Sequence, residues 1–207
     1  MTRFDNLFMD GRSHRLPASW QARVGDLLVL LVAGMLLLGG WMFKDWMYDQ
    51  FRYLALDENE IAIPYPPNWI RQSSPRGDFR VIAPHDASAF PPSEWVRILP
   101  SPNAPLADAW PAQRAAELDD FIELKRARVR LADNREAFLL IYAFVARPEQ
   151  EDAPPLVAVQ GMDLVFRARY EGAKHLVAIT LAAETSDWER AWPTFQRILA
   201  KLGVKTP

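Results

Sequence analysis

Residues 24–43 read V-G-D-L-L-V-L-L-V-A-G-M-L-L-L-G-G-W-M-F, and from Leu27 to Phe43 this stretch carries no charged side chain. A helix that spans a membrane requires about 20 mostly apolar residues, which is the length of this stretch. Its glycines would weaken a soluble helix, but glycine is frequent in membrane spans. A buried core helix of a soluble protein is the alternative. We predict a transmembrane helix over residues 24–43, followed by one folded domain.

The charges on either side of this stretch predict its orientation. The preceding tail, residues 1–23, contains four arginines: Arg3, Arg12, Arg15 and Arg23. Basic residues in short flanks remain on the cytoplasmic side. We therefore expect a cytoplasmic N-terminal tail in a single-pass plasma-membrane protein. Its C-terminal domain then lies on the periplasmic or extracellular side.

A cleaved signal peptide is the competing interpretation of residues 24–43. The apolar run is longer than the apolar core (h-region) of a typical signal peptide, and bulky residues (Trp41, Met42 and Phe43) stand where a peptidase requires small ones. This favours an uncleaved signal-anchor. The chain has no cysteine, which excludes a lipoprotein anchor, disulfides and thiolate metal sites.

Residues 44–58 continue the helical pattern and are rich in aromatic side chains. We expect a juxtamembrane helical linker there. Its rings either lie at the level of the lipid headgroups or contact another membrane subunit. The residues predicted to contact a partner are Trp41, Trp46, Tyr48 and Phe51.

Residues 59–207 predict one α+β domain. The expected elements are strands at 60–65, 77–84 and 94–99, a helix at 106–126, strands at 128–131, 137–146, 156–170 and 174–181, and a helix from Ser186 to Gly203. The nearly all-apolar segment 137–146 is typical of a central strand covered on both faces. The whole domain is expected to be an antiparallel sheet packed against helices.

Three local features accompany these elements. Gly161 predicts a bulge in its long strand. Ser186 and Glu189 form a capping-box pattern at the start of the last helix. Pro193 is expected to kink that helix or to delay its start.

Two segments of the domain resemble PsbP-type domains. One is I-x-I-x-Y-P-x-x-W over residues 61–69, and the other is the strand and helix of residues 175–184 and 188–199. PsbP-type domains are known as extrinsic subunits of the oxygen-evolving photosystem, and related folds occur in Ran-binding proteins. The resemblance implies a PsbP-like fold and a non-catalytic docking role on a larger assembly.

No catalytic or cofactor signature is present. His14, His85 and His175 are too far apart to suggest a metal site, and haem or iron–sulfur attachment would need cysteine. A hydrolase would require His85 to meet a serine and a carboxylate in space. Asp119, Asp120 and Glu123 are interpreted as a solvated acidic helix face. We therefore expect neither an enzyme nor a cofactor.

The partners are expected to be the lipid bilayer and other subunits of a membrane complex. The net charge of −2 and the lack of a basic stripe argue against nucleic acid. The sequence favours a non-catalytic accessory subunit of an electron-transport or photosynthetic complex, which stabilises assembly or forms a docking surface. The alternative is a membrane-anchored domain that binds or senses a ligand or peptide.

Overall fold

The computed structural model describes residues 20–48, 50–56, 61–72, 78–84, 88–101, 104–147 and 156–204. Most of the predicted tail, including His14, and the loop that holds His85 lie outside these ranges. The chain divides into two compact units, Met1–Asp49 and Gln50–Pro207.

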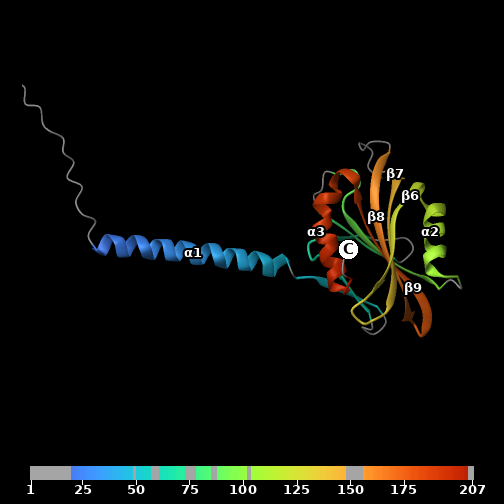
Figure 1. The fold of residues 1–207 in the computed structure, drawn as a ribbon, viewed down its shortest axis with the longest axis horizontal. Coiled ribbons are helices and arrows are strands. Elements are labelled where there is room, and N and C mark those ends of the chain that lie inside the picture. Colours follow the sequence, from blue (N-terminus) through green and yellow to red (C-terminus); the bar gives the residue numbers. More distant parts are fainter. Residues whose placement is uncertain are drawn as a thin grey trace, which may run out of the picture. The chain divides into compact units, whose positions relative to one another are not determined.

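The first unit consists of helix α1, Trp20–Tyr48 (Figure 1). Its segment Gly25–Lys44 is 20 residues long and is apolar enough to cross a membrane, judged by length and composition. None of this segment is buried. The exposure distinguishes this segment from the core helix of a soluble protein, which would be mostly buried, whereas a signal sequence near the N-terminus would have the same length and composition.

The second unit is a sheet between two helices, α2 on one face and α3 on the other (Figure 1). The seven-stranded antiparallel sheet has the order β3-β4-β5-β9-β8-β7-β6, and β1 and β2 form a separate antiparallel pair. The elements are β1 Arg52–Leu56, β2 Ile61–Tyr65, β3 Ile70–Gln72, β4 Phe79–Ile82, β5 Ser93–Pro100, α2 Leu106–Glu117, β6 Asp119–Arg130, β7 Glu136–Ala146, β8 Val157–Tyr170, β9 Ala173–Glu184, the short 3-10 helix η1 Thr185–Asp187, and α3 Trp188–Lys201.

Alternating side chains divide the sheet between two cores. On strand β7, Leu139 joins the larger core beneath α3, and its neighbour Leu140 joins the smaller core beneath α2. Phe195 of α3 and Trp110 of α2 are nearly fully buried against these two faces. This confirms the predicted central strand at 137–146 and the predicted α+β class.

The helical linker predicted at 44–58 is wrong for residues 52–56. Residues 52–56 form strand β1, which pairs with β2 from Arg52↔Tyr65 to Leu56↔Ile61. Leu54 and Leu56 pack on the α3-face core, while the alternate residues of β1 are exposed. The alternation of buried and exposed residues is typical of a strand. The same aromatic-rich segment also fits the spacing of a helix, which explains the wrong prediction. The compact unit accordingly begins at Gln50, nine residues before the predicted boundary.

The predicted helix at 106–126 is also too long. Helix α2 ends at Glu117, Leu118 is extended, and β6 pairs with β7 from Asp119 onward. The register of β6 shifts twice, and Asp120 has a φ of 50°. These irregularities give the strand an apolar spacing that resembles a helix. Asp119, Asp120 and Glu123 therefore lie on an edge strand and not on a helix face.

Strand β8 contains no bulge at Gly161, because its pairings with β7 and β9 continue without a register shift. Tyr142 is the cross-strand partner of this glycine, and a Cβ atom at position 161 would lie 2.7 Å from the tyrosine ring. The glycine therefore makes room for the ring. It does not bend the strand.

The last helix differs from its prediction at the start and agrees with it at the end. The predicted capping box does not form: Ser186 Oγ donates to Glu184 Oε1 at 2.9 Å, and η1 precedes α3. The predicted end is confirmed, since Gly203 has a φ of 81° directly after the helix. Gly203 also passes so close to Ala132 that no side chain fits there.

Candidate functional site

One end of the sheet carries the β6–β7 turn (131–135) and the β8–β9 turn (171–172), and we call it the hairpin end (Figure 1). Strand β5 also finishes there, since Pro100 pairs with His175 near the start of β9. The loop that leads into α2 begins at the same place. Segments that are distant in sequence therefore meet at the hairpin end.

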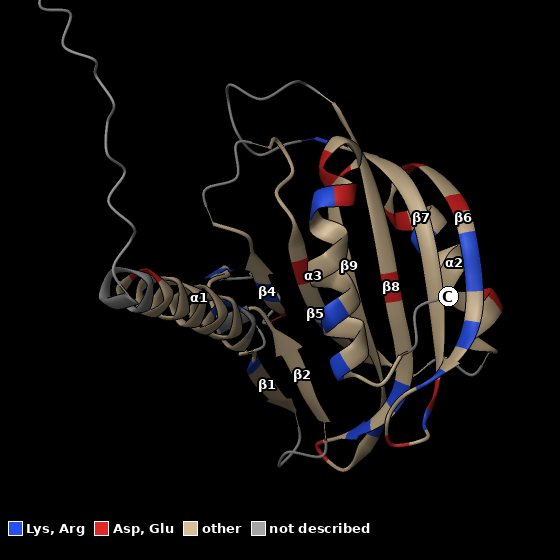
Figure 2. Cartoon of the chain, turned by 60° about the vertical axis from the view of Figure 1, so that its left-hand side comes forward, with Lys and Arg blue, Asp and Glu red and all other residues tan. Residues whose placement is uncertain are grey.

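Basic side chains gather at this end on the α2 face of the sheet. Phe138 of β7 and Val165 of β8 belong to the α2-face core, and the basic residues stand at alternating positions that share this face. They are Arg128 and Arg130 on β6, Arg167 and Arg169 on β8, and Lys174 on β9. Figure 2 shows the blue basic segments of β6 and β8 near these turns.

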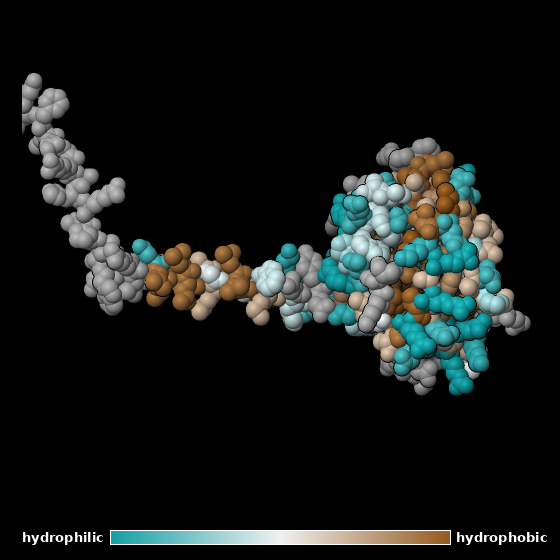
Figure 3. All heavy atoms as spheres, in the orientation of Figure 1, coloured by the Kyte–Doolittle hydropathy of each residue, from teal (hydrophilic) through white to brown (hydrophobic). Residues whose placement is uncertain are grey.

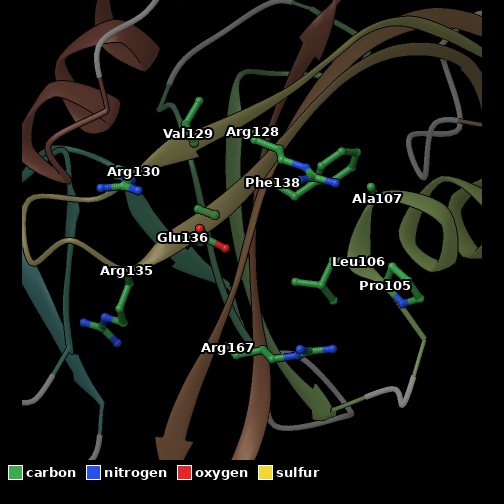
Figure 4. Close-up of a pocket in the computed structure, with 11 residues that line it drawn as sticks. Pro105, Leu106, Ala107, Arg128, Val129, Arg130, Arg135, Glu136, Phe138 and Arg167 are labelled. Atoms are coloured by element: carbon green, nitrogen blue, oxygen red, sulfur yellow. The ribbon is translucent and has the colours of Figure 1, made fainter.

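A groove of about 670 Å³ lies among these side chains, between the sheet and the start of α2 (Figure 4). A second hollow of about 440 Å³ shares Arg135 and Arg167 with it and is completed by Arg169 and Lys174. We call the two hollows together the basic groove. Its basic residues are Arg128, Arg130, Arg135, Arg167, Arg169 and Lys174.

The groove has an apolar side and a charged side. Leu106 and Phe138 line it beneath α2, and Arg128 and Arg167 extend toward the start of this helix (Figure 4). Arg167 Nη2 donates to the carbonyl oxygen of Ala104 at 3.3 Å, which ties the arginine to the loop before α2. Such a lining can accept a charged group that carries an apolar portion.

The positive charge of the groove is incompletely balanced. Arg135 forms an ion pair with Asp133, and Glu136 is the one acidic residue among the described residues that line the larger hollow. Within the described part of the chain, Arg128, Arg130, Arg169 and Lys174 form no ion pair. The site therefore attracts anions.

A buried ionic cluster fixes α2, which forms one wall of the groove. Asp163 of β8 is fully buried and accepts two hydrogen bonds from Arg114 of α2, from Nε at 2.6 Å and from Nη2 at 2.9 Å. Trp110 Nε1 donates to the same carboxylate at 2.7 Å, and the Tyr142 hydroxyl donates to it at 3.0 Å. Both carboxylate oxygens are satisfied and shielded from water, so this aspartate holds the helix and is not available as a base.

The cluster extends to Glu117, the last residue of α2. Glu117 accepts hydrogen bonds from Arg114 at 3.0 Å and from Arg97 of β5 at 3.2 Å. Burial lowers the pKa of Arg114, but its attraction to Asp163, Tyr142 and Glu117 outweighs this, and the net pKa is raised. Arg114 therefore remains charged inside the protein, and α2 is bound to the sheet by ionic contacts.

Glu94 is a second buried carboxyl group, on the opposite face of the sheet. It lies on β5 between Val81 and Leu181, which belong to the α3-face core. Its side chain is fully buried, and neither oxygen has a hydrogen-bond partner. Burial raises the pKa of Glu94 well above its ordinary value.

The residues predicted to contact a partner divide between the two units. Trp41 and Trp46 are exposed on α1, at 64% and 59% of their surface, and Tyr48 is the last residue of this helix. Phe51 belongs to the domain and packs partly against the α3-face core. Lys201 Nζ lies 6.0 Å from the centre of its ring. Their role in binding remains a prediction.

The histidines form no site within the described residues. His175 is partly exposed on β9, with Nδ1 3.3 Å from the carbonyl oxygen of Ala173 and its ring against Tyr170. His85, which a hydrolase would require to meet a serine and a carboxylate, lies outside the described ranges. Among the residues that the structure describes, no group of three or more His, Asp or Glu side chains could hold a metal ion.

The expectation that the chain has no basic stripe is wrong. The groove is encoded by two alternating segments, R-A-R-V-R over 126–130 and R-A-R over 167–169. Alternate residues of a strand share one face, so each segment places two or more arginines side by side. The near-neutral net charge concealed this local concentration.

Solved structures resemble the chain more clearly than sequences do. No family model and no curated protein matches it. The solution structure of cyanobacterial PsbP from Synechocystis sp. PCC 6803 matches with a TM-score of 0.52, 12% identity, and coverage of 76% of this chain and 94% of that one. The domain has a PsbP-like fold. An identity this low establishes the fold alone.

Two further structures match the same domain more weakly. LpqN of Mycobacterium tuberculosis, which is involved in cell envelope biogenesis, has a TM-score of 0.47 and 13% identity over 75% of this chain and 92% of its own. The Ran-binding protein Mog1p of Saccharomyces cerevisiae has a TM-score of 0.45 and 12% identity over 74% of this chain and 93% of its own.

Proposed function

We propose that the chain is a non-catalytic, single-pass accessory subunit of a larger membrane complex. The observation that carries this proposal is helix α1, whose 20-residue apolar segment has no buried residue, joined to a PsbP-like domain. A segment of this length and composition is sufficient to cross a bilayer. Figure 3 shows the contrast between the hydrophobic helix and the more hydrophilic surface of the domain.

An anchor supports an accessory role by confining the domain. A domain that cannot diffuse from the membrane is present at a high effective concentration around its partner, so weak contacts suffice for binding. The arginines of residues 1–23 favour a cytoplasmic N-terminus. The PsbP-like domain would then act on the outer face of the plasma membrane.

The PsbP-like fold favours an electron-transport or photosynthetic complex as the host, by analogy of fold. The alternative, a small-molecule sensor, would be supported by an enclosed apolar pocket between sheet and helix. The hollows formed by the described residues are instead open and rich in arginine. They suit a charged macromolecular or membrane surface better than a small apolar ligand.

The test is purification from native membranes in mild detergent, through a C-terminal tag, followed by identification of the co-purifying subunits. We expect co-migration with a large assembly, and its loss when Trp41, Trp46, Tyr48 and Phe51 are replaced together by alanine. Because Phe51 also packs on the domain core, a variant that keeps Phe51 and changes the other three separates binding from folding.

The matched control replaces Ile122 and Leu124, two exposed apolar residues of β6, by alanine. This variant removes exposed apolar surface elsewhere and should co-purify normally. Migration of the unaltered protein as a lone monomer or dimer would contradict the proposal.

A further inference from the structure

The chain enters the domain at its hairpin end. Phe51, the second residue of the domain, lies 6.0 Å from Lys201 Nζ at the end of α3. The next residue, Leu202, accepts a hydrogen bond at 3.0 Å from the backbone N–H of Ala132 in the β6–β7 turn. The entry point, the end of α3 and the turn beside the basic groove are therefore neighbours.

A short connection limits how far this end can lie from the anchor. Asp49 is the single residue between Tyr48, which ends α1, and Gln50, which begins the domain. An extended chain advances at most about 3.6 Å per residue, so Tyr48 and Gln50 lie within about 7 Å of each other. If α1 spans the bilayer, the entry point lies near the lipid headgroups.

We propose that the hairpin end rests on the membrane and that the basic groove binds the phosphate groups of anionic phospholipids. This inference depends on the proposed membrane anchor, but it does not depend on a host complex. The guanidinium group of arginine binds phosphate oxygens through paired hydrogen bonds. The two hollows, which share Arg135 and Arg167, offer room for two headgroups.

The distribution of charge supports this orientation. Asp119 and Asp120 begin β6 at the end opposite to Arg130, and Glu184 and Asp187 lie where β9 finishes. Among the described residues, the hairpin end has an excess of basic side chains despite Asp133, Glu136 and Glu171, and the far end has an excess of acidic ones despite Arg147 and Arg190 (Figure 2). Anionic phospholipid in the leaflet that faces the domain attracts the first end and repels the second, which orients the domain.

Lipid is favoured over other anions because of where the groove lies. Headgroups are present at the anchored end of every molecule, whereas an acidic peptide or a nucleic acid must first be recruited there. The apolar side chains of Leu106 and Phe138 beside the arginines also suit the region between phosphate and acyl chain.

The experiment uses the full chain in nanodiscs of phosphatidylcholine alone or with about one third phosphatidylglycerol. Hydrogen exchange is measured for the β6–β7 and β8–β9 turns. We expect roughly tenfold slower exchange at these turns in the anionic discs, and loss of this difference at high salt. The paired variant Arg128→Gln with Arg169→Gln should abolish the difference.

The matched control is Lys125→Gln with Arg190→Gln, which removes two exposed positive charges outside the groove and should leave the protection intact. Co-elution with discs of either composition reports the anchor separately. A chain that fails to co-elute would contradict the anchor itself. A chain that co-elutes but shows equal exchange in both discs would overturn the lipid site alone, as would protection by poly-glutamate or an oligonucleotide without any by phosphatidylglycerol.

Discussion

Glu94 shows how one residue can make stability depend on pH. Its carboxyl group has no partner in the α3-face core, and burial raises its pKa well above the ordinary value of 4.5. The folded protein therefore retains a proton that the unfolded chain releases above about pH 4.5. The stability that depends on this proton is complete below that pH, and it is lost as the pH rises toward the folded-state pKa.

We expect the urea midpoint of the unaltered protein, measured in detergent, to fall between about pH 5 and pH 8. The variant Glu94→Gln cannot ionise and should show a flatter curve over this range. The groups whose pKa is lowered, Glu117, Asp133 and Glu184, lose their contribution at more acidic pH and do not interfere. Parallel curves for the two proteins would contradict the assignment.

Some of these residues could be identified from the sequence, and others could not. The arginines of the basic groove could be found by testing charged residues, as well as apolar ones, for a period of two. The pairing of Arg114 with Asp163 could not, because the two residues are 49 positions apart and belong to a helix and a strand. Glu94 occupies a strand position where its sequence neighbours give no sign of burial.

Helix α2 illustrates how an element is attached through a few polar contacts. Its buried apolar residues are Trp110 and Pro111, and the Arg114–Asp163 pair supplies the directional bonds. Removal of one partner from a buried ion pair leaves a desolvated charge and costs about 3–5 kcal/mol. The ionic cluster thus decides where α2 lies on the sheet.

We therefore expect Asp163→Asn to lower the free energy of unfolding by about 3–5 kcal/mol, because Arg114 is left charged and buried. Urea denaturation in detergent, followed by near-ultraviolet circular dichroism, measures this. The control Glu123→Gln breaks an exposed pair with Arg126 and should cost at most about 1 kcal/mol. Equal effects of the two changes would show that the buried pair is dispensable.

The elements predicted best from the sequence are those with strong, regular patterns. The central strand at 137–146 and the end of the last helix at Gly203 are confirmed. The errors lie in segments whose apolar residues fit both the spacing of a helix and the spacing of a strand. Residues 52–56 and 119–126 fit a helix locally, and pairing with a neighbouring strand decides between the alternatives.

At the scale of the whole molecule, the orientation in the membrane can be tested directly because the chain contains no cysteine. A single cysteine can be placed in the tail by Ser13→Cys or on the exposed surface of α2 by Ala116→Cys. In right-side-out membrane vesicles, an impermeant maleimide should label the variant with cysteine at position 116. It should label the variant at position 13 only after the vesicles are opened.

The reverse labelling pattern would place the domain in the cytoplasm. Labelling of both variants in closed vesicles would contradict a membrane-spanning α1. Each outcome is independent of the partner and of the lipid site, so the experiment tests orientation alone.

The architecture was accessible from sequence because apolar residues at the two ends of the domain define it. The opening segment at 61–69 and the closing strand and helix at 175–199 pack on the same α3-face core, which explains their characteristic spacing. The groove on the surface could not be predicted from the sequence in the same way. A groove arises from side chains of several strands and a helix start, and no single segment specifies it.

The two outer strands of the sheet have a consequence if the proposed anchor confines the protein to a membrane. Copies in a membrane collide often and with their sheets held at similar heights, a condition that promotes pairing of open strand edges. Strand β3 is only three residues long, and β6 is interrupted by register shifts and carries many charges. Short, irregular and charged edges resist such pairing. Neither outer strand therefore offers a long, regular edge for pairing between copies of the domain.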